Sequence, residues 1–228
     1  MRKRSKRYRA LAEKIDDKRV YPLDEAIQIL KTCATETFDQ SVDVSMKLGI
    51  DAKQSDQMVR GSVSLPKGTG KTVRVVAFCQ GADVEAAREA GAIDAGADEL
   101  IEKVQNGWLD FDVALAHPEM MPKVGRLGRT LGPKGLMPSP KSGTVVTDIP
   151  SAVGEFIGGK IEFRNDAGGN VHALVGKLSF DETDLAQNVR AFVGKIRSLR
   201  PSGTKGIFVH KVTLSTTMGP PVQVSVEE

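Results

Sequence analysis

The sequence contains few of the residues that mark several common classes of protein. Two cysteines in 228 residues are too few for a disulfide framework or for a four-cysteine zinc site. Aromatic residues make up only 5%, so an array of aromatic platforms for stacked bases is not expected. No run approaches the ~20 apolar residues of a membrane-spanning helix. No apolar stretch follows the basic N-terminus, as a secretory signal would require. We therefore expect a cytoplasmic protein with no membrane partner.

Positive charge is concentrated at the start of the chain. Residues 1–19 contain nine Lys or Arg and three acidic residues, a net charge of +6, whereas the rest of the chain carries −3. A basic arm on a nearly neutral body is typical of nucleic-acid binding, because each neutralised phosphate releases condensed counterions. A solvated tail or a patch for an anionic membrane surface would have the same charge. A second basic stretch contains Lys123, Arg126, Arg129, Lys134 and Lys141.

The first and last parts of the chain have the patterns of an α+β domain. Helical spacing predicts one helix over residues 5–16 and a second from Pro22, with a buried stripe that extends to Ala34. Alternating apolar residues predict strands over 41–50 and 59–65. The patterns nearer the C-terminus predict a hairpin of strands 160–164 and 170–178, a helix over 181–199, and strands over 207–213 and 222–226.

The middle of the chain has a different pattern. Apolar runs at 72–79 and 111–116 are typical of strands buried on both faces, and helices are predicted between and after them. This alternation indicates an α/β three-layer, Rossmann-like domain with a parallel sheet. The simplest organisation is a discontinuous α+β domain, residues 1–67 and 160–228, split by an inserted α/β domain, residues 68–159. One fused domain is the alternative. The glycine-rich crossings predict a hinge at Gly68, Gly70, Gly158 and Gly159.

Motifs for enzymes are incomplete. Residues 68–72 resemble a phosphate-binding P-loop, but Leu65 stands where the pattern needs its first glycine, and a strand follows instead of a helix. The turn after residues 72–79 lacks the glycines of a dinucleotide site. The three histidines share no ligand spacing, and Asp110 and Asp112 are interpreted as solvated charges on a strand. We therefore expect no catalytic residue, no metal and no cofactor.

Residues 125–141 form the most distinctive local pattern. Four glycines and three prolines in seventeen residues are too many for a helix or a strand, so we predict a loop of specified shape. Its small residues would let a partner approach the backbone, and its cations suit phosphates. An ordinary solvated loop is the alternative.

This stretch resembles the central motif of the ribosomal protein L1 family, the stalk proteins of the large ribosomal subunit, in their bacterial form. Seven further segments match the family in order, namely 6–9, 38–42, 48–51, 55–61, 107–112, 161–166 and 216–220. The resemblance implies two domains, the N- and C-terminal segments together building one of them. It also implies a monomer within the cytoplasmic ribosome that binds large-subunit ribosomal RNA, helps release deacylated tRNA at the exit site, and represses its own messenger RNA.

The resemblance also implies which residues contact RNA. The family's RNA-binding surface maps onto Phe38, Ser41, Thr217, Met218 and Gly219. A ring, hydroxyls and a backbone near glycine can follow a folded RNA by its shape and its 2′-OH groups. The alternative is that Phe38 and Met218 are core residues. Weaker candidates are Asn165, Asp166, Arg2 and Arg4, and candidates for tRNA contact are Lys53, Arg60, Arg126, Arg129 and Lys134.

Two positions depart from the family pattern. Thr37 stands where many members carry a basic residue, and Ser41 stands where threonine is common.

Two other functions also stay open. One is an enzyme that uses the crevice of the α/β domain near His117, with the basic loop holding a phosphorylated substrate. The other is a free-standing regulator whose main ligand is messenger RNA. Co-sedimentation with large ribosomal subunits would separate these functions from the first.

Overall fold

The computed structural model describes residues 4–225 apart from positions 17 and 55. Its contacts divide the chain into two compact units. Unit 1 comprises Met1–Gly70 and Ile161–Glu228, and unit 2 comprises Lys71–Lys160. Both units contain helices and strands, so the expected mixture of α and β structure is confirmed. Over the described residues, no helix has both the length and the apolar character needed to cross a bilayer.

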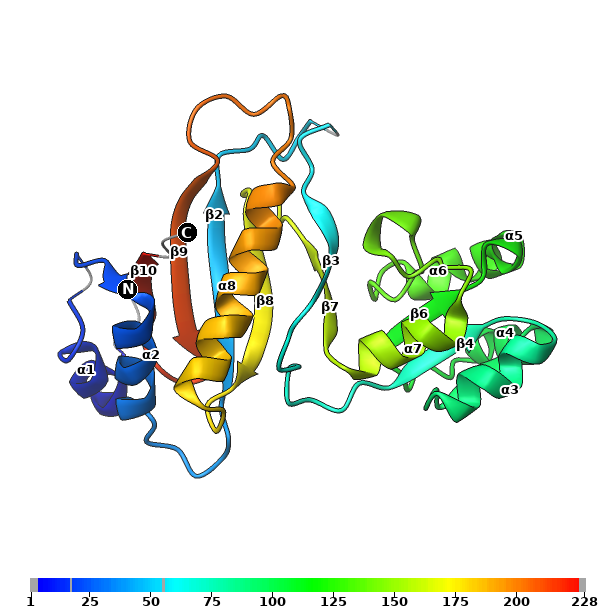
Figure 1. The fold of residues 1–228 in the computed structure, drawn as a ribbon, viewed down its shortest axis with the longest axis horizontal. Helices are drawn as coiled ribbons and strands as arrows, with labels where there is room; N and C mark the ends of the chain where they lie inside the picture. The colour runs from blue at the N-terminus through cyan, green and yellow to red at the C-terminus, as the bar shows by residue number, and fades with distance from the viewer. Residues whose placement is uncertain (1–3, 17, 55, 226–228) are drawn as a thin grey trace. The chain divides into compact units, whose positions relative to one another are not determined.

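Unit 1 is built on a five-stranded sheet with the strand order β1-β10-β9-β2-β8 (Figure 1). The central strand β2 (Ser41–Leu48) runs antiparallel to both neighbours, β8 (Asn170–Lys177) and β9 (Val209–Thr216). The sheet continues through β10 (Val222–Ser225) to the short parallel strand β1 (Tyr21–Pro22). A separate two-stranded sheet joins β3 (Arg60–Ser64) to β7 (Lys160–Arg164).

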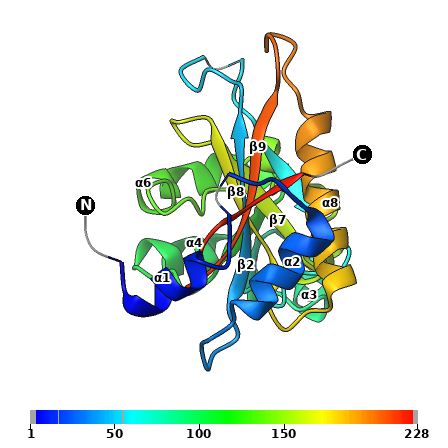
Figure 2. The same ribbon diagram turned by 90° about the vertical axis from the view of Figure 1, so that its left-hand side faces the viewer.

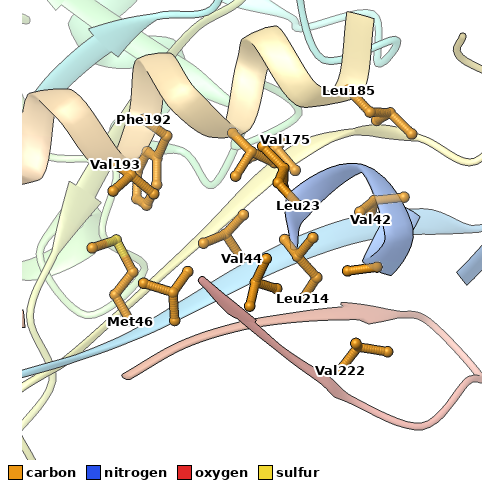
Figure 3. Packing of buried hydrophobic residues seen from close by; sticks show 14 of the residues in the cluster. Leu23, Val42, Val44, Met46, Val175, Leu185, Phe192, Val193, Leu214 and Val222 are labelled. Carbon is orange, nitrogen blue, oxygen red and sulfur yellow. The ribbon is translucent and has the colours of Figure 1, made fainter. Parts of the chain in front are cut away.

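One face of this sheet is covered by helices and the other is open. The helices α2 (Leu23–Thr32) and α8 (Glu182–Ser198) lie on the same side of the sheet and pack against each other (Figure 2). Alternate residues of β2 are buried beneath them, and Figure 3 shows Val44 and Met46 near Phe192 and Val193 of α8. The residues between them, Ser41, Asp43, Ser45 and Lys47, therefore belong to the open, polar face.

Unit 2 has three layers around a parallel sheet of order β5-β4-β6. The strands are β5 (Asp94–Gly96), β4 (Val75–Phe78) and β6 (Val113–Ala116). Successive residues of β4 face different cores. Val75 and Ala77 pack with α3 (Ala82–Glu89) and α7 (Ile149–Ile157), whereas Val76 and Phe78 pack with α4 (Asp98–Gln105). Helices therefore cover both faces of the sheet, as the continuous apolar runs indicate.

The basic Gly/Pro-rich stretch is only in part the loop that its composition predicts, since residues 132–139 lie outside any helix or strand but residues 125–131 are helical. The chain from residue 118 to 131 consists of short helical turns: η1 (Pro118–Met120), α5 (Met121–Val124), η2 (Gly125–Leu127) and α6 (Gly128–Leu131). A further turn, η3, covers Pro140–Ser142. For residues 125–131 the prediction was wrong because Val124, Leu127 and Leu131 recur at helical spacing and are buried against α4 and β4, which outweighs the low helix propensity of glycine.

Four smaller expectations also need correction. Strands β7 and β8 do not form a regular hairpin, since β7 pairs with β3 and β8 pairs with β2, although the Asn165–Val171 bridge links their ends. The first helix, α1 (Lys6–Ala12), is shorter than predicted, and Ala34 lies exposed beyond the end of α2. The strand expected from residue 207 begins at Val209, and Ile207 is 69% exposed.

Candidate nucleic-acid interface

The five residues of the main predicted surface come from two segments that meet at one end of the unit 1 sheet. Ser41 is the first residue of β2, and Thr217 directly follows β9. The Ser41 N–H donates to Thr217 Oγ1 at 3.1 Å, and the Thr217 N–H donates to the Ser41 carbonyl at 3.2 Å. These bonds extend the antiparallel pairing of Val42 with Thr216. Residues 176 positions apart in the sequence therefore form one continuous surface.

Two large apolar side chains project from this surface. Phe38 is 49% exposed and Met218 is 44% exposed, so neither is a core residue. The Met218 N–H is fixed by the buried side chain of Gln40, whose Oε1 accepts it at 3.1 Å. A Cβ at Gly219 would lie 2.3 Å from Thr216 Oγ1, so a side chain there would require that hydroxyl to move. The backbone of the turn is therefore held in place while the Met218 side chain stays available to a partner.

Two cations flank the turn. Lys177, at the end of β8, pairs with Ser41 in the sheet, and its Nζ donates to Ser41 Oγ at 3.1 Å. Arg7 of α1 donates to the Met218 carbonyl at 3.3 Å and forms an ion pair with Glu36. Sequence reasoning missed Lys177 because its position depends on the strand register. Arg7 lies in a segment that matches the family, but its partners are distant in the sequence.

One carboxylate lies beside this surface on the open face of the sheet. Asp43 pairs with Ser215 of β9 and with Leu174 of β8. Burial raises the pKa of Asp43 above its ordinary value, although the charges of His172 and Lys177 oppose the shift. An anionic group at this position would repel a phosphate, so the sugar-phosphate backbone of a bound nucleic acid would fit better beside Lys177.

The structure does not bring Asn165 and Asp166 to this surface. Ser41 pairs with Lys177 whereas Lys47 pairs with Asn170, so the turn at 165–169 lies at the other end of the sheet, about 20 Å away. The Asn165 amide accepts from the Val59 N–H at 2.9 Å and donates to the Asp166 carbonyl at 3.0 Å.

Asp166 has a role within the same turn. Its carboxylate accepts from the Asn170 side chain at 2.9 Å and from the Asn170 N–H at 2.7 Å, and these bonds lower its pKa to about 2. The contacts of Asp166 and Asn165 order the turn between β7 and β8.

Part of the basic N-terminal segment is folded. Arg2 lies outside the described residues. The Arg4 guanidinium stacks over the Tyr8 ring at 4.8 Å, and Ser5 Oγ caps α1 by accepting from the Tyr8 N–H at 3.2 Å. Since Arg7 is held by Glu36, the described part of the segment is a docked helix, and its charges have defined positions.

The candidates for tRNA contact are distributed over both units. In unit 1, Lys53 is exposed in the connection after β2, and Arg60 is the first residue of β3. In unit 2, exposed cations lie on or beside the helical turns of residues 125–131. They are Arg126, Arg129 and Lys134. Lys123 of the same stretch pairs with Asp98 at 2.8 Å.

Unit 2 offers little support for the enzyme alternative. A pocket of about 430 Å³ lies at the N-terminal end of α7, and its lining includes Asp148 and Glu155 but, among the described residues, no Lys or Arg. Asp148 caps α7 by accepting from the Ser151 N–H at 3.2 Å. Such a pocket is unsuited to a phosphorylated substrate. His117 is not part of its lining, and its Nδ1 caps η1 at 3.4 Å.

The other titratable candidates in unit 2 form ion pairs. Asp112 pairs with Lys71 at 3.0 Å and with Arg74 at 3.1 Å, and Asp110 also pairs with Arg74. Burial favours a higher pKa for Asp112, but these bonds outweigh it and hold that pKa below its ordinary value. No group of three or more metal-ligating side chains occurs in the part of the chain that the structure describes.

The four predicted hinge glycines differ in conformation. Gly68, Gly70 and Gly159 have φ values of 65°, 68° and 112°, which favour glycine. Gly158 has an ordinary helical φ of −68° at the end of α7, so it gives no conformational freedom of this kind. Gly68 is also anchored, because its carbonyl accepts from the buried Asn188 of α8 at 2.9 Å.

Comparison with known proteins gives a consistent result. The profile of the "Ribosomal protein L1p/L10e family" matches residues 29–220. A protein of Nocardioides sp. named "Large ribosomal subunit protein uL1" is 55% identical over 221 residues, which cover 97% of this chain and 92% of the relative. Proteins of the same name from Cutibacterium acnes and Thermobifida fusca are 54% and 53% identical over 222 residues, with 97% of this chain and 96% and 94% of the relatives covered.

Proposed function

The chain belongs to the ribosomal protein L1 family, and from this premise we propose that it is a constituent of the large ribosomal subunit in the cytoplasm. In this proposal it binds large-subunit ribosomal RNA through the end of the unit 1 sheet around Ser41, Thr217 and Met218. Like its relatives, which are named for the large ribosomal subunit, it would act as a structural component and not as an enzyme.

The observation that supports this site most directly is the convergence of three kinds of group. Exposed Phe38 and Met218 offer apolar surface for bases, and Lys177 and Arg7 offer positive charge. Between them lie hydroxyls and a glycine turn that admit close approach of a ribose. Single-stranded and folded RNA is recognised by such combinations of stacking, 2′-OH contacts and phosphate contacts.

The two departures from the family pattern have different expected effects. Ser41 keeps the hydroxyl of threonine, and Lys177 Nζ orients it. Thr37 removes a cation from the surface, and Lys177 supplies one close to Ser41. We therefore expect the location of the site to be unchanged by these departures.

The test uses the full chain and the RNA that copurifies with it. Nuclease treatment of the complex, followed by sequencing of the protected RNA, should recover a segment of large-subunit ribosomal RNA. Met218→Ala should weaken binding of that segment by roughly 1–3 kcal/mol, because a packed contact is left empty. The matched control is Met58→Ala, since Met58 is also exposed (37%) but lies in the connection between β2 and β3. Equal losses for both variants would contradict this location.

The finer functions are part of the same proposal. We infer that units 1 and 2 are the two domains and that the chain is monomeric within the ribosome. Unit 1 would be anchored on ribosomal RNA while unit 2, with exposed Arg126, Arg129 and Lys134, contacts exit-site tRNA and assists its release. Repression of the chain's own messenger RNA would use the unit 1 surface. Recovery of its own message alone among protected RNAs would favour a free-standing regulator.

The hinge requires its own measurement. Both cysteines, Cys33 and Cys79, are buried, so they are unsuitable for labelling. Labels at Lys195→Cys in unit 1 and Glu85→Cys in unit 2 would be placed on exposed helix positions. A distance distribution that changes on addition of tRNA would support the hinge, and a single narrow distance under all conditions would contradict it.

A further inference from the structure

An open pocket of about 300 Å³ adjoins the candidate RNA surface. It lies between the connection from α2 to β2 and the residues that follow β8. The residues that define its chemistry are Lys31, Phe38, Asp39, Gln40, Leu178 and Ser179. Gln40 also holds the Met218 N–H, so the pocket and the Met218 turn share one buried side chain. A ligand bound at the turn could therefore extend into the pocket.

The pocket combines apolar walls with a fixed hydrogen-bond acceptor. The half-exposed Phe38 ring and Leu178 provide the apolar surface. The Asp39 carboxylate accepts from the Ser179 N–H at 3.1 Å through one oxygen and from the Ser179 hydroxyl at 2.8 Å through the other. Each carboxylate oxygen can accept a second hydrogen bond. Asp39 is exposed, so these remaining acceptor positions are accessible to a ligand.

The charge of Asp39 restricts which part of an RNA can enter. A phosphate would be repelled by the carboxylate, and a ribose would leave the Phe38 ring without a stacking partner. The edge of a base, in contrast, carries N–H donors, and its flat face can stack on an aromatic ring. Guanine is the base that presents two adjacent donors, N1–H and the N2 amino group, to one carboxylate. Its O6 then remains as an acceptor for a cation.

Lys31 completes this arrangement. It lines the same pocket and has no ion-pair partner among the residues that the structure describes. We propose that the pocket binds one unpaired guanine of the RNA, with its ring against Phe38, its N1–H and N2 amino group donating to Asp39, and its O6 facing Lys31. This inference rests on the proposed RNA-binding function and adds a base-specific subsite to it.

Base substitution in the RNA tests the inference without changing the protein. The probe is the RNA segment protected by the wild-type chain, with single guanines replaced in turn by inosine, which lacks the N2 amino group. Inosine at one unpaired guanine should weaken binding about 10-fold, within the range for loss of a bidentate contact to a base. The same replacement should have no effect on binding to Asp39→Asn, because that variant has already lost the paired acceptors.

The sign of the Asp39→Asn effect gives a second test. The substitution removes a negative charge, so electrostatic attraction alone predicts tighter binding of RNA. The proposed contact predicts weaker binding, by about 10-fold for the unmodified probe. Asp83→Asn in α3 of unit 2 is the matched control for charge, and it should leave binding unchanged or slightly tighter. An asparagine at position 39 can still bond to Ser179, and a thermal melt checks that the fold is retained.

The outcomes separate this inference from the proposed function. If the wild-type chain binds no ribosomal RNA, the proposed function is wrong and the pocket proposal falls with it. If the chain binds but no guanine is sensitive to inosine, or if Asp39→Asn binds as tightly as the wild type, the guanine subsite is wrong while the proposed function stands. Inosine sensitivity at one guanine that disappears in Asp39→Asn supports the subsite.

Discussion

Replacement of Asn188 by leucine should destabilise unit 1 and release the chain that leads towards unit 2. Asn188 lies on the buried face of α8 and is completely inaccessible to solvent. Its Oδ1 accepts from the Lys67 N–H at 3.1 Å. Its Nδ2 donates to the Gly68 carbonyl at 2.9 Å and to the Val175 carbonyl at 2.8 Å. One side chain thus connects the helix, the edge strand β8 and the segment that leaves unit 1.

The expected loss of stability follows from the hydrogen bonds that the partners of Asn188 lose. Val42 pairs with Gly176 and Asp43 with Leu174, so Val175 is the extra residue of a β-bulge and has no partner in the ladder. It is fully buried, and leaving its carbonyl unsatisfied costs about 1–3 kcal/mol. Lys67 and Gly68 are nearer the surface and can bond to water, so each lost bond costs about 0.5–1.5 kcal/mol. With some compensation from the apolar leucine, we expect a net loss of about 2–4 kcal/mol.

Unfolding by urea and by heat measures the loss of stability, and limited proteolysis measures the release of the segment. The loss should lower the melting temperature of unit 1 by about 10 °C, and cleavage at residues 66–71 should become faster because the segment is no longer held. Gln187→Leu is the matched control, since Gln187 is the neighbouring residue on the exposed side of α8. A loss below about 1 kcal/mol for Asn188→Leu, or an equal loss for Gln187→Leu, would refute the reasoning.

Three further predictions concern charge. Lys177→Gln should weaken the salt dependence of RNA binding, which is measured as the slope of log K against log[salt]. The slope should fall in magnitude by about 0.7–0.9, the value for one phosphate contact, and Lys195→Gln should leave it unchanged. Asp43→Asn should stabilise the protein at pH 7, because burial raises the pKa of the native carboxyl and its ionisation opposes folding. That gain, measured by urea unfolding, should vanish as the pH falls below about 4, where the unfolded chain is also protonated. Asp112→Asn should lower stability at pH 7 by about 1 kcal/mol or less, and the loss should vanish as the pH falls through the lowered pKa of Asp112.

Helices with clear ends could be predicted closely from the sequence. The pattern Asp148-Ile149-Pro150 places a capping side chain before a proline at the start of a helix, and α7 begins at Ile149 with Asp148 as its cap. The long α8 was recognised from its apolar stripe, and Leu185, Phe192 and Ile196 are buried. In such elements the local signal and the tertiary packing agree, so the sequence pattern is sufficient.

Strand partners could not be predicted in the same way. A period of two identifies β7 and β8 as strands but does not determine their partners, and the simplest assumption, a hairpin, was wrong. The position of Lys177 beside Ser41 depends on the same register. Composition was also misleading at residues 125–131, where exposed glycines conceal a helical apolar spacing.

The candidate site was located mainly by the family resemblance, but the residues that support it were not predicted. Phe38 and Met218 could be placed, but Gln40 and Asn188 were not, and the sequence does not indicate that Gln40 is buried. Asn188 did give one signal. It lies three residues after Leu185 and four before Phe192, on the buried stripe of α8, and a polar residue at such a position requires buried hydrogen-bond partners.

The order of the strands explains why this surface requires both halves of unit 1. Strand β2 lies between β8 and β9, so its backbone groups are satisfied only when residues 161–228 pair with it. Thr217 bonds to the first residue of β2, and Lys177 reaches the same residue from the other side. The first 70 residues therefore cannot present the surface alone, and its formation must await long-range pairing across the whole of unit 2. An RNA bound at the proposed surface would contact all three strands, and if it binds only the paired state, its binding free energy would stabilise the closure of unit 1.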